Sequence, residues 1–142
     1  MKTFRYGPVS FQYPADWELT AEQDAAAWTA QVESPGTAFF LASLRPELED
    51  AGELAEETLT ALRAEYKELD AEPVVVSLGG WPAMGHDVDF LTVDTPTLCL
   101  IRCINTAAGP VLFLAQVSEL DRAISEPALR AILDSVVIDD EE

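Results

Sequence analysis

The sequence is poor in the side chains that bind metals and form disulfides. It contains a single histidine and two cysteines, Cys99 and Cys103, which are too few ligands for a structural zinc site. Residues four apart on an extended strand lie about 13 Å from each other, so these two thiols can neither pair nor share one metal ion. We therefore expect no metal, no cofactor and no disulfide, which fits a reducing compartment.

Long apolar runs are also absent. No stretch approaches the ~20 apolar residues that span a bilayer. Residues 1–8 do not contain the apolar core of a signal peptide. We therefore expect a cytoplasmic protein that does not bind a membrane.

Basic residues are scarce, and the charge of the chain is strongly negative. It has 26 acidic and 8 basic residues, which give a net charge of −18. This charge repels phosphate backbones and anionic lipids, so we expect no binding to nucleic acid or membranes. It attracts a protein partner with a basic surface, most strongly at low salt. The same acidity is also explained by solubility alone or by a salt-adapted host.

The sequence does contain enough apolar residues for one folded domain. Hydrophobic residues make up 49% of the 142 residues, which is sufficient for a core of ordinary size. No repeat or linker divides the chain. We therefore expect a single domain over residues 1–138, followed by an acidic tail at 139–142.

Alternating apolar and polar residues predict a series of strands joined by tight turns, which favour antiparallel pairing. The predicted strands cover residues 4–6, 9–13, 17–19, 28–33, 39–44, 73–78, 83–93, 97–105 and 111–117. The last two are apolar on both faces, so we expect them near the centre of the sheet.

Two segments have helical periodicity. Asp50 and Glu53 are spaced as the capping box of the first helix, and its apolar stripe continues to Leu69. The second helix is expected to begin at Ser125 as N-cap, with Pro127 in its first turn. The elements together predict an α+β fold, with a central antiparallel sheet of about six to eight strands and helices packed on it.

Three motifs stand in the order of a known family. They are an aromatic segment at Phe11–Trp17, a turn at Gly79–Ala83 that leads into a long strand, and a closing helix at Pro127–Ser135. This arrangement resembles the PsbP-like superfamily, which includes the photosystem protein PsbP, a Ran-binding nuclear import factor of yeast and bacterial DcrB-like proteins. The resemblance implies an α/β/α sandwich and a binding role without catalysis. DcrB-like relatives also suggest a homodimeric accessory protein of a secretion system.

Three side chains are candidates for contact with a partner. Trp28 follows a polar loop and Trp81 lies beside two glycines and a proline, and aromatic residues on loops are enriched at binding sites. Burial at the strand ends is the alternative for both tryptophans. Arg102 is a candidate for contact with an anion or a partner, but an ion cluster with Asp87 and Asp89 across neighbouring strands is the commoner arrangement.

His86 is the candidate for chemistry or ligand binding. As a general base oriented by Asp87 or Asp89, it would belong to a small ligand-binding protein or hydrolase. Strand alternation places both aspartates on the opposite face, which favours a buried imidazole. Our main hypothesis is therefore a non-catalytic, cytoplasmic protein-binding or scaffolding domain that is not an enzyme. The His86 site and the homodimer remain alternatives.

Overall fold

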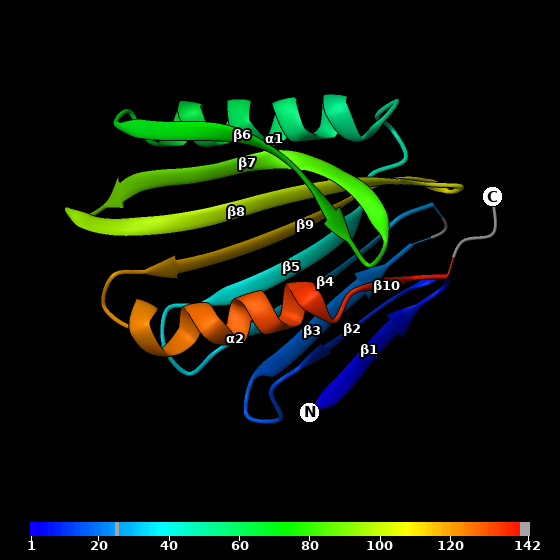
Figure 1. The fold of residues 1–142 in the computed structure, drawn as a ribbon, viewed down its shortest axis with the longest axis horizontal. Helices are drawn as coiled ribbons and strands as arrows, with labels where there is room; N and C mark the ends of the chain where they lie inside the picture. Colours follow the sequence, from blue (N-terminus) through cyan, green and yellow to red (C-terminus); the bar gives the residue numbers. More distant parts are fainter. Residues whose placement is uncertain (25, 140–142) are drawn as a thin grey trace.

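A seven-stranded antiparallel sheet forms the centre of the computed structural model, which describes residues 1–24 and 26–139 (Figure 1). Its strands are, in spatial order, β3 (Glu18–Gln23), β4 (Trp28–Glu33), β5 (Phe39–Leu44), β9 (Gly109–Ser118), β8 (Thr95–Thr106), β7 (Trp81–Thr92) and β6 (Leu69–Leu78). The two strands predicted at the centre, β8 and β9, occupy inner positions. The α+β fold with an antiparallel sheet is confirmed.

A smaller sheet brings the two ends of the described chain together. It has the order β1 (Lys2–Tyr6), β2 (Val9–Tyr13) and β10 (Val137–Ile138). After β10, the Asp139 N–H donates a hydrogen bond to the Pro8 carbonyl over 2.7 Å. Residues 140–142 of the expected acidic tail lie outside the described residues.

The two helices cover opposite faces of the large sheet. On β8, Leu100 belongs to the core shared with α2 (Arg122–Asp134) and the small sheet. The next residue, Ile101, belongs to a second core beneath α1 (Ala51–Glu65). Because neighbouring strand residues point to opposite faces, the sheet separates these two cores. None of the described helices has the length and apolar composition needed to cross a membrane.

The first helix begins as predicted and ends earlier. The Glu53 N–H donates to Asp50 Oδ1 over 2.8 Å, and Glu53 Oε1 accepts from the Glu49 N–H over 2.7 Å. The helix stops at Glu65, and Leu69 already begins β6. The prediction that β6 starts at residue 73 is therefore wrong. Pro73 is tolerated inside β6 because this is an edge strand, where one missing N–H need not break a ladder.

The start of the second helix also differs from the prediction. Helix α2 begins at Arg122 with Asp121 as N-cap, so Ser125 is not the cap and Pro127 lies inside the helix. Ser125 is buried in the first turn instead, where its hydroxyl donates to Asp121 Oδ2 over 3.0 Å. Asp121 fixes the helix start because it also accepts hydrogen bonds from Thr37.

Candidate functional site

His86 and the two neighbouring aspartates do not form one site. The His86 ring faces α1, is 7% exposed, and its Nε2 lies 3.2 Å from Glu56 Oε2. Asp87 points to the opposite face of β7, as strand alternation predicts. The carboxylate beside His86 therefore comes from Glu56 of α1, which the sequence analysis did not single out. Its position three residues before buried Leu59, at the border of the apolar stripe, is the signal that was missed.

Arg102 lies in an ion pair with one of the two predicted aspartates. Its Nη1 is 2.9 Å from Asp87 Oδ1 and also donates to the Ile101 carbonyl over 3.0 Å. The guanidinium is 7% exposed and stands opposite the fully buried Phe113. Removing Asp87, whose side chain is half-buried, would leave the buried Arg102 charge uncompensated, so the pair contributes to the fold. Little of Arg102 is accessible to another molecule.

Trp81 connects the β6–β7 turn to the C-terminal strand. Its indole Nε1 donates to the Ile138 carbonyl over 3.2 Å. Gly79, in the same turn, has a φ of 60°, and a Cβ there would lie 2.5 Å from the Val136 carbonyl oxygen. Only glycine allows this approach. A partner-binding role for Trp81 stays a prediction, because these contacts already give the turn a structural role.

Trp28 lines a hollow between the small sheet and the edge of the large one. We call this site the aromatic hollow. Its volume is about 230 Å³, and its lining residues are Phe4, Tyr6, Ala21, Glu22, Gln23, Trp28 and Thr29. The Trp28 ring centroid lies 5.9 Å from that of Phe4 and 5.5 Å from that of Tyr6. Trp28 is 6% exposed, so it forms the floor of the hollow rather than a projecting surface.

The two cysteines are buried and separate. Cys99 and Cys103 are unpaired, in line with their spacing, and both lie in the core beneath α1. Burial raises the pKa of each thiol to about 12. The thiolate is the reactive form of cysteine, so neither residue is a nucleophile near neutral pH.

Four carboxylates face each other in pairs on β6 and β7, and we call them the acidic edge. Asp70 stands directly opposite Asp89, and Glu72 directly opposite Asp87. Side chains in such positions are about 5 Å apart at Cβ, and like charges there are destabilising. Among the described residues, no group of three or more histidine, cysteine or acidic side chains is arranged to hold a metal ion.

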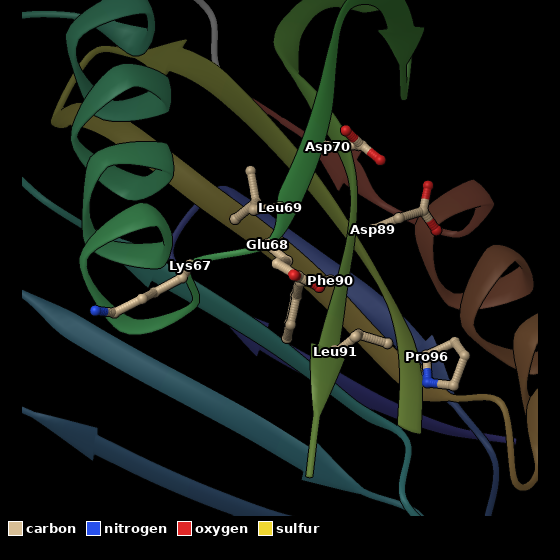
Figure 2. A pocket seen from close by; sticks show the side chains of 8 residues that line it. All are labelled: Lys67, Glu68, Leu69, Asp70, Asp89, Phe90, Leu91 and Pro96. Atoms are coloured by element: carbon tan, nitrogen blue, oxygen red, sulfur yellow. The ribbon is translucent and has the colours of Figure 1, made fainter. Parts of the chain in front are cut away.

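An open hollow of about 430 Å³ adjoins the acidic edge. It is lined by residues 67–70, 89–91 and Pro96. Figure 2 shows the carboxylates of Asp70 and Asp89 on the same side of the two strands, while the Lys67 ammonium points away from them. The one basic side chain of this lining therefore does not neutralise the aspartates.

Four arginines are already paired with carboxylates. In the described part of the chain, these pairs are Arg45–Glu47, Arg102–Asp87, Arg122–Glu126 and Arg130–Glu126. The hydrogen bond that Arg122 donates to Glu126 raises the pKa of Arg122, and the charges of Asp89 and Glu119 raise it further. Asp70 and Glu72 have no ion pair with any described residue. The outer part of the acidic edge thus keeps its negative charge.

The likeness of this chain to known proteins lies in its fold and not in its sequence. No family model matches the sequence, and no curated protein matches it. The cyanobacterial PsbP (CyanoP) of Synechocystis superposes with a TM-score of 0.65 and 12% identity, over 96% of this chain and 91% of that one. The chain has the PsbP-like fold.

Two further solved structures superpose on this chain. PA94 from Pseudomonas aeruginosa superposes with a TM-score of 0.59 and 14% identity, over 96% of each chain. A protein from Bacteroides thetaiotaomicron has a TM-score of 0.62 and 16% identity over 99% of this chain and 49% of that one. The present chain therefore spans about half the length of the Bacteroides protein. At these identities the likeness concerns the fold alone.

Proposed function

We propose that this protein is a non-catalytic, cytoplasmic protein-binding or scaffolding domain whose acidic edge binds a basic surface of a partner protein. The observation that carries the proposal is the pairing of like charges, Asp70 with Asp89 and Glu72 with Asp87. Of the four carboxylates of the acidic edge, only Asp87 has an ion-pair partner among the described residues. A basic partner supplies the charges that this edge lacks.

The energetics of the sheet support this proposal. Each directly opposed pair of like charges destabilises a sheet by a few tenths of a kcal/mol to about 1 kcal/mol. Local features that disfavour the fold without a structural benefit are typical of functional sites. Complementary charge also accelerates association and selects partners. The separation of His86 from Asp87 supports a role without catalysis.

Capture of partners by charge-matched variants tests the proposal. We expect Asp70→Asn/Asp89→Asn to lose a basic protein that the wild type retains from a native lysate at low salt. The control is Glu57→Gln/Glu65→Gln, which removes two exposed charges from α1 and should retain the same protein. Quantitative mass spectrometry of the captured proteins provides the comparison.

The stability of the same variants shows whether the fold is intact. Asp70→Asn/Asp89→Asn should change the free energy of unfolding by less than about 1 kcal/mol, because it removes one like-charge contact and also the attraction between Asp89 and Arg122. A loss of binding in a protein of nearly unchanged stability is then a surface effect. If both double variants capture the same proteins equally well, the acidic edge is not the binding surface.

Self-association is a second candidate, because one end of the molecule exposes apolar side chains. This apolar end comprises Leu91, Val93, Leu120 and Ile124. The Glu119 N–H donates to the Pro96 carbonyl over 2.8 Å, and this bond joins the segment 91–96 to the segment 119–124. Val93 is 93% exposed with a φ of 48°, which is unfavourable for a β-branched residue in a turn. Exposed apolar side chains at one end of a molecule mark an interface when they form a continuous patch.

A further inference from the structure

We propose that the aromatic hollow binds the side chain of an arginine or lysine presented by a partner protein. This inference rests on the proposed function for one point, that the partner is basic. It concerns a different place, because β3 and β6 are the opposite edge strands of the large sheet (Figure 1). The hollow lies at β3, and the acidic edge lies at β6 and β7.

The rings of the hollow are arranged before any ligand arrives. Phe4 and Tyr6 lie on the same face of β1, and both rings pack against Trp28. Phe4 is held further by Phe11, whose ring centroid is 5.2 Å away. Tyr6 is 38% exposed and is the accessible wall. The face of an aromatic ring attracts cations, most often an arginine guanidinium.

The charges around the hollow favour a cation over an anion. Glu22 lines the hollow from the other face of β3, because it pairs with Thr29 and not with Trp28, and no basic residue is among the lining residues. An adjoining hollow of about 280 Å³ shares Trp28 and is also lined by Asp24. Asp24 Oδ1 accepts hydrogen bonds from the backbone N–H groups of residues 26 and 27, each over 2.9 Å. These bonds lower the pKa of Asp24, so its carboxylate stays charged near neutral pH.

The size of the hollow favours a single side chain. Pockets for drug-sized ligands usually exceed about 300 Å³, and this hollow has about 230 Å³. A small free cation should bind there only weakly, because its few contacts offset little of its loss of translational freedom. When the side chain belongs to a partner protein, the other contacts of the interface offset this loss of translational freedom. The occupant is therefore a basic residue of a protein.

Nuclear magnetic resonance can detect this binding at Trp28 itself. The probes are N-acetyl-arginine amide and its uncharged analogue N-acetyl-citrulline amide. We expect the arginine probe to shift the Trp28 indole N–H resonance saturably, with the resonance assigned through Trp28→Phe. The citrulline probe should leave it in place. No saturable shift, or equal shifts with both probes, would overturn the proposal.

Matched variants separate the site from the general charge of the protein. Tyr6→Leu removes the exposed ring but keeps an apolar side chain, and it should weaken binding of the arginine probe about two- to fivefold. Glu22→Gln should weaken it as well. Glu18→Gln, on the same strand but outside the hollow, should leave the affinity unchanged. If Glu18→Gln and Glu22→Gln weaken it equally, the probe responds to overall charge, and the proposal fails.

The failure of this inference can be told from that of the proposed function. Asp70→Asn/Asp89→Asn should not alter the response of Trp28 to the arginine probe. If the probe does not bind but that variant still loses a captured partner, only the aromatic hollow is wrongly assigned. If the probe binds with the expected variant pattern but no partner depends on the acidic edge, only the proposed function fails.

Discussion

Phe11 is fully buried where the small sheet packs on the large one. Its ring centroid lies 5.2 Å from that of Phe4 and 5.0 Å from that of Phe40, which in turn stacks on Phe113. We expect Phe11→Ala to lower the free energy of unfolding by about 3–5 kcal/mol, because the cavity is bordered by rings that cannot collapse into it. Urea denaturation followed by circular dichroism measures this loss.

Phe39 provides the control for Phe11. It precedes the buried Phe40 on β5, so its ring lies on the opposite face of the sheet, where it is only half-buried. Phe39→Ala should lower the free energy of unfolding by less than half as much as Phe11→Ala, because the Phe39 ring buries less apolar surface. A near-zero effect of Phe11→Ala would show that this ring does not anchor the two sheets.

The role of Phe11 is readable from the sequence, whereas those of the two candidate tryptophans are not. Alternation along a strand places Phe11 on an apolar face, and burial follows from that face alone. Trp28 acquires its role from rings on β1, and Trp81 from the Ile138 carbonyl, 57 residues away. Such contacts depend on how distant segments pack. The partner-contact role of Trp28 stays a prediction, and sequence reasoning did not single out Tyr6, its exposed neighbour.

At the scale of elements, Asp121 joins the start of α2 to the β4–β5 turn. The Thr37 hydroxyl donates to Asp121 Oδ1, and the Thr37 N–H donates to Oδ2 over 3.1 Å. The Ser125 hydroxyl also donates to Oδ2, over 3.0 Å. Partial burial alone would raise the pKa of Asp121, but the hydrogen bonds from Thr37 and Ser125 outweigh it and hold the pKa below the ordinary value. The carboxylate form therefore stabilises this junction.

Asp121→Asn should lower the free energy of unfolding by about 1 kcal/mol near neutral pH, because an amide replaces one accepting oxygen by a donor. The folded-state pKa is depressed, so the wild-type advantage is fully present above the unfolded value of 3.8. It is lost as the pH falls through the lower folded-state pKa. The difference between the two proteins should thus close in acid.

Urea denaturation at neutral pH and in acid measures this difference. Asp16→Asn, in a turn where the Asp16 side chain has no hydrogen bond to a described residue, is the control and should show little difference at either pH. If the effect of Asp121→Asn is the same at both pH values, the charge of Asp121 is not what holds the junction.

The boundaries of elements were the part of the fold that the sequence did not predict. The helix start was placed at Ser125 because Ser-Glu-Pro is a local capping pattern. The actual N-cap is Asp121, which accepts a hydrogen bond from Thr37, 84 residues earlier in the chain. Strand β6 was likewise expected to begin at Pro73, although pairing with β7 extends it back to Leu69. The inner positions of β8 and β9 were predictable, because a strand that is apolar on both faces must be covered on both sides of the sheet.

At the scale of the whole molecule, the net charge of −18 affects the two candidate functions in opposite ways. Attraction between the acidic edge and a basic partner weakens as salt screens it. Two copies of this chain repel each other, and the same screening removes that repulsion. Hydrophobic contact at the apolar end does not depend on charge and persists in salt. The sign of the salt dependence therefore distinguishes partner binding from self-association.

We expect the protein to be monomeric at low salt and to form dimers as the salt approaches about 1 M, where the Debye length is about 3 Å. Ile124→Lys should prevent the high-salt dimer, because it places a charge within the apolar end. Val75→Lys, at a similarly exposed position on β6, should not prevent it. Sedimentation velocity at both salt concentrations provides the measurement. A dimer that is stable at low salt, or that both variants abolish equally, would place the self-association surface away from Ile124.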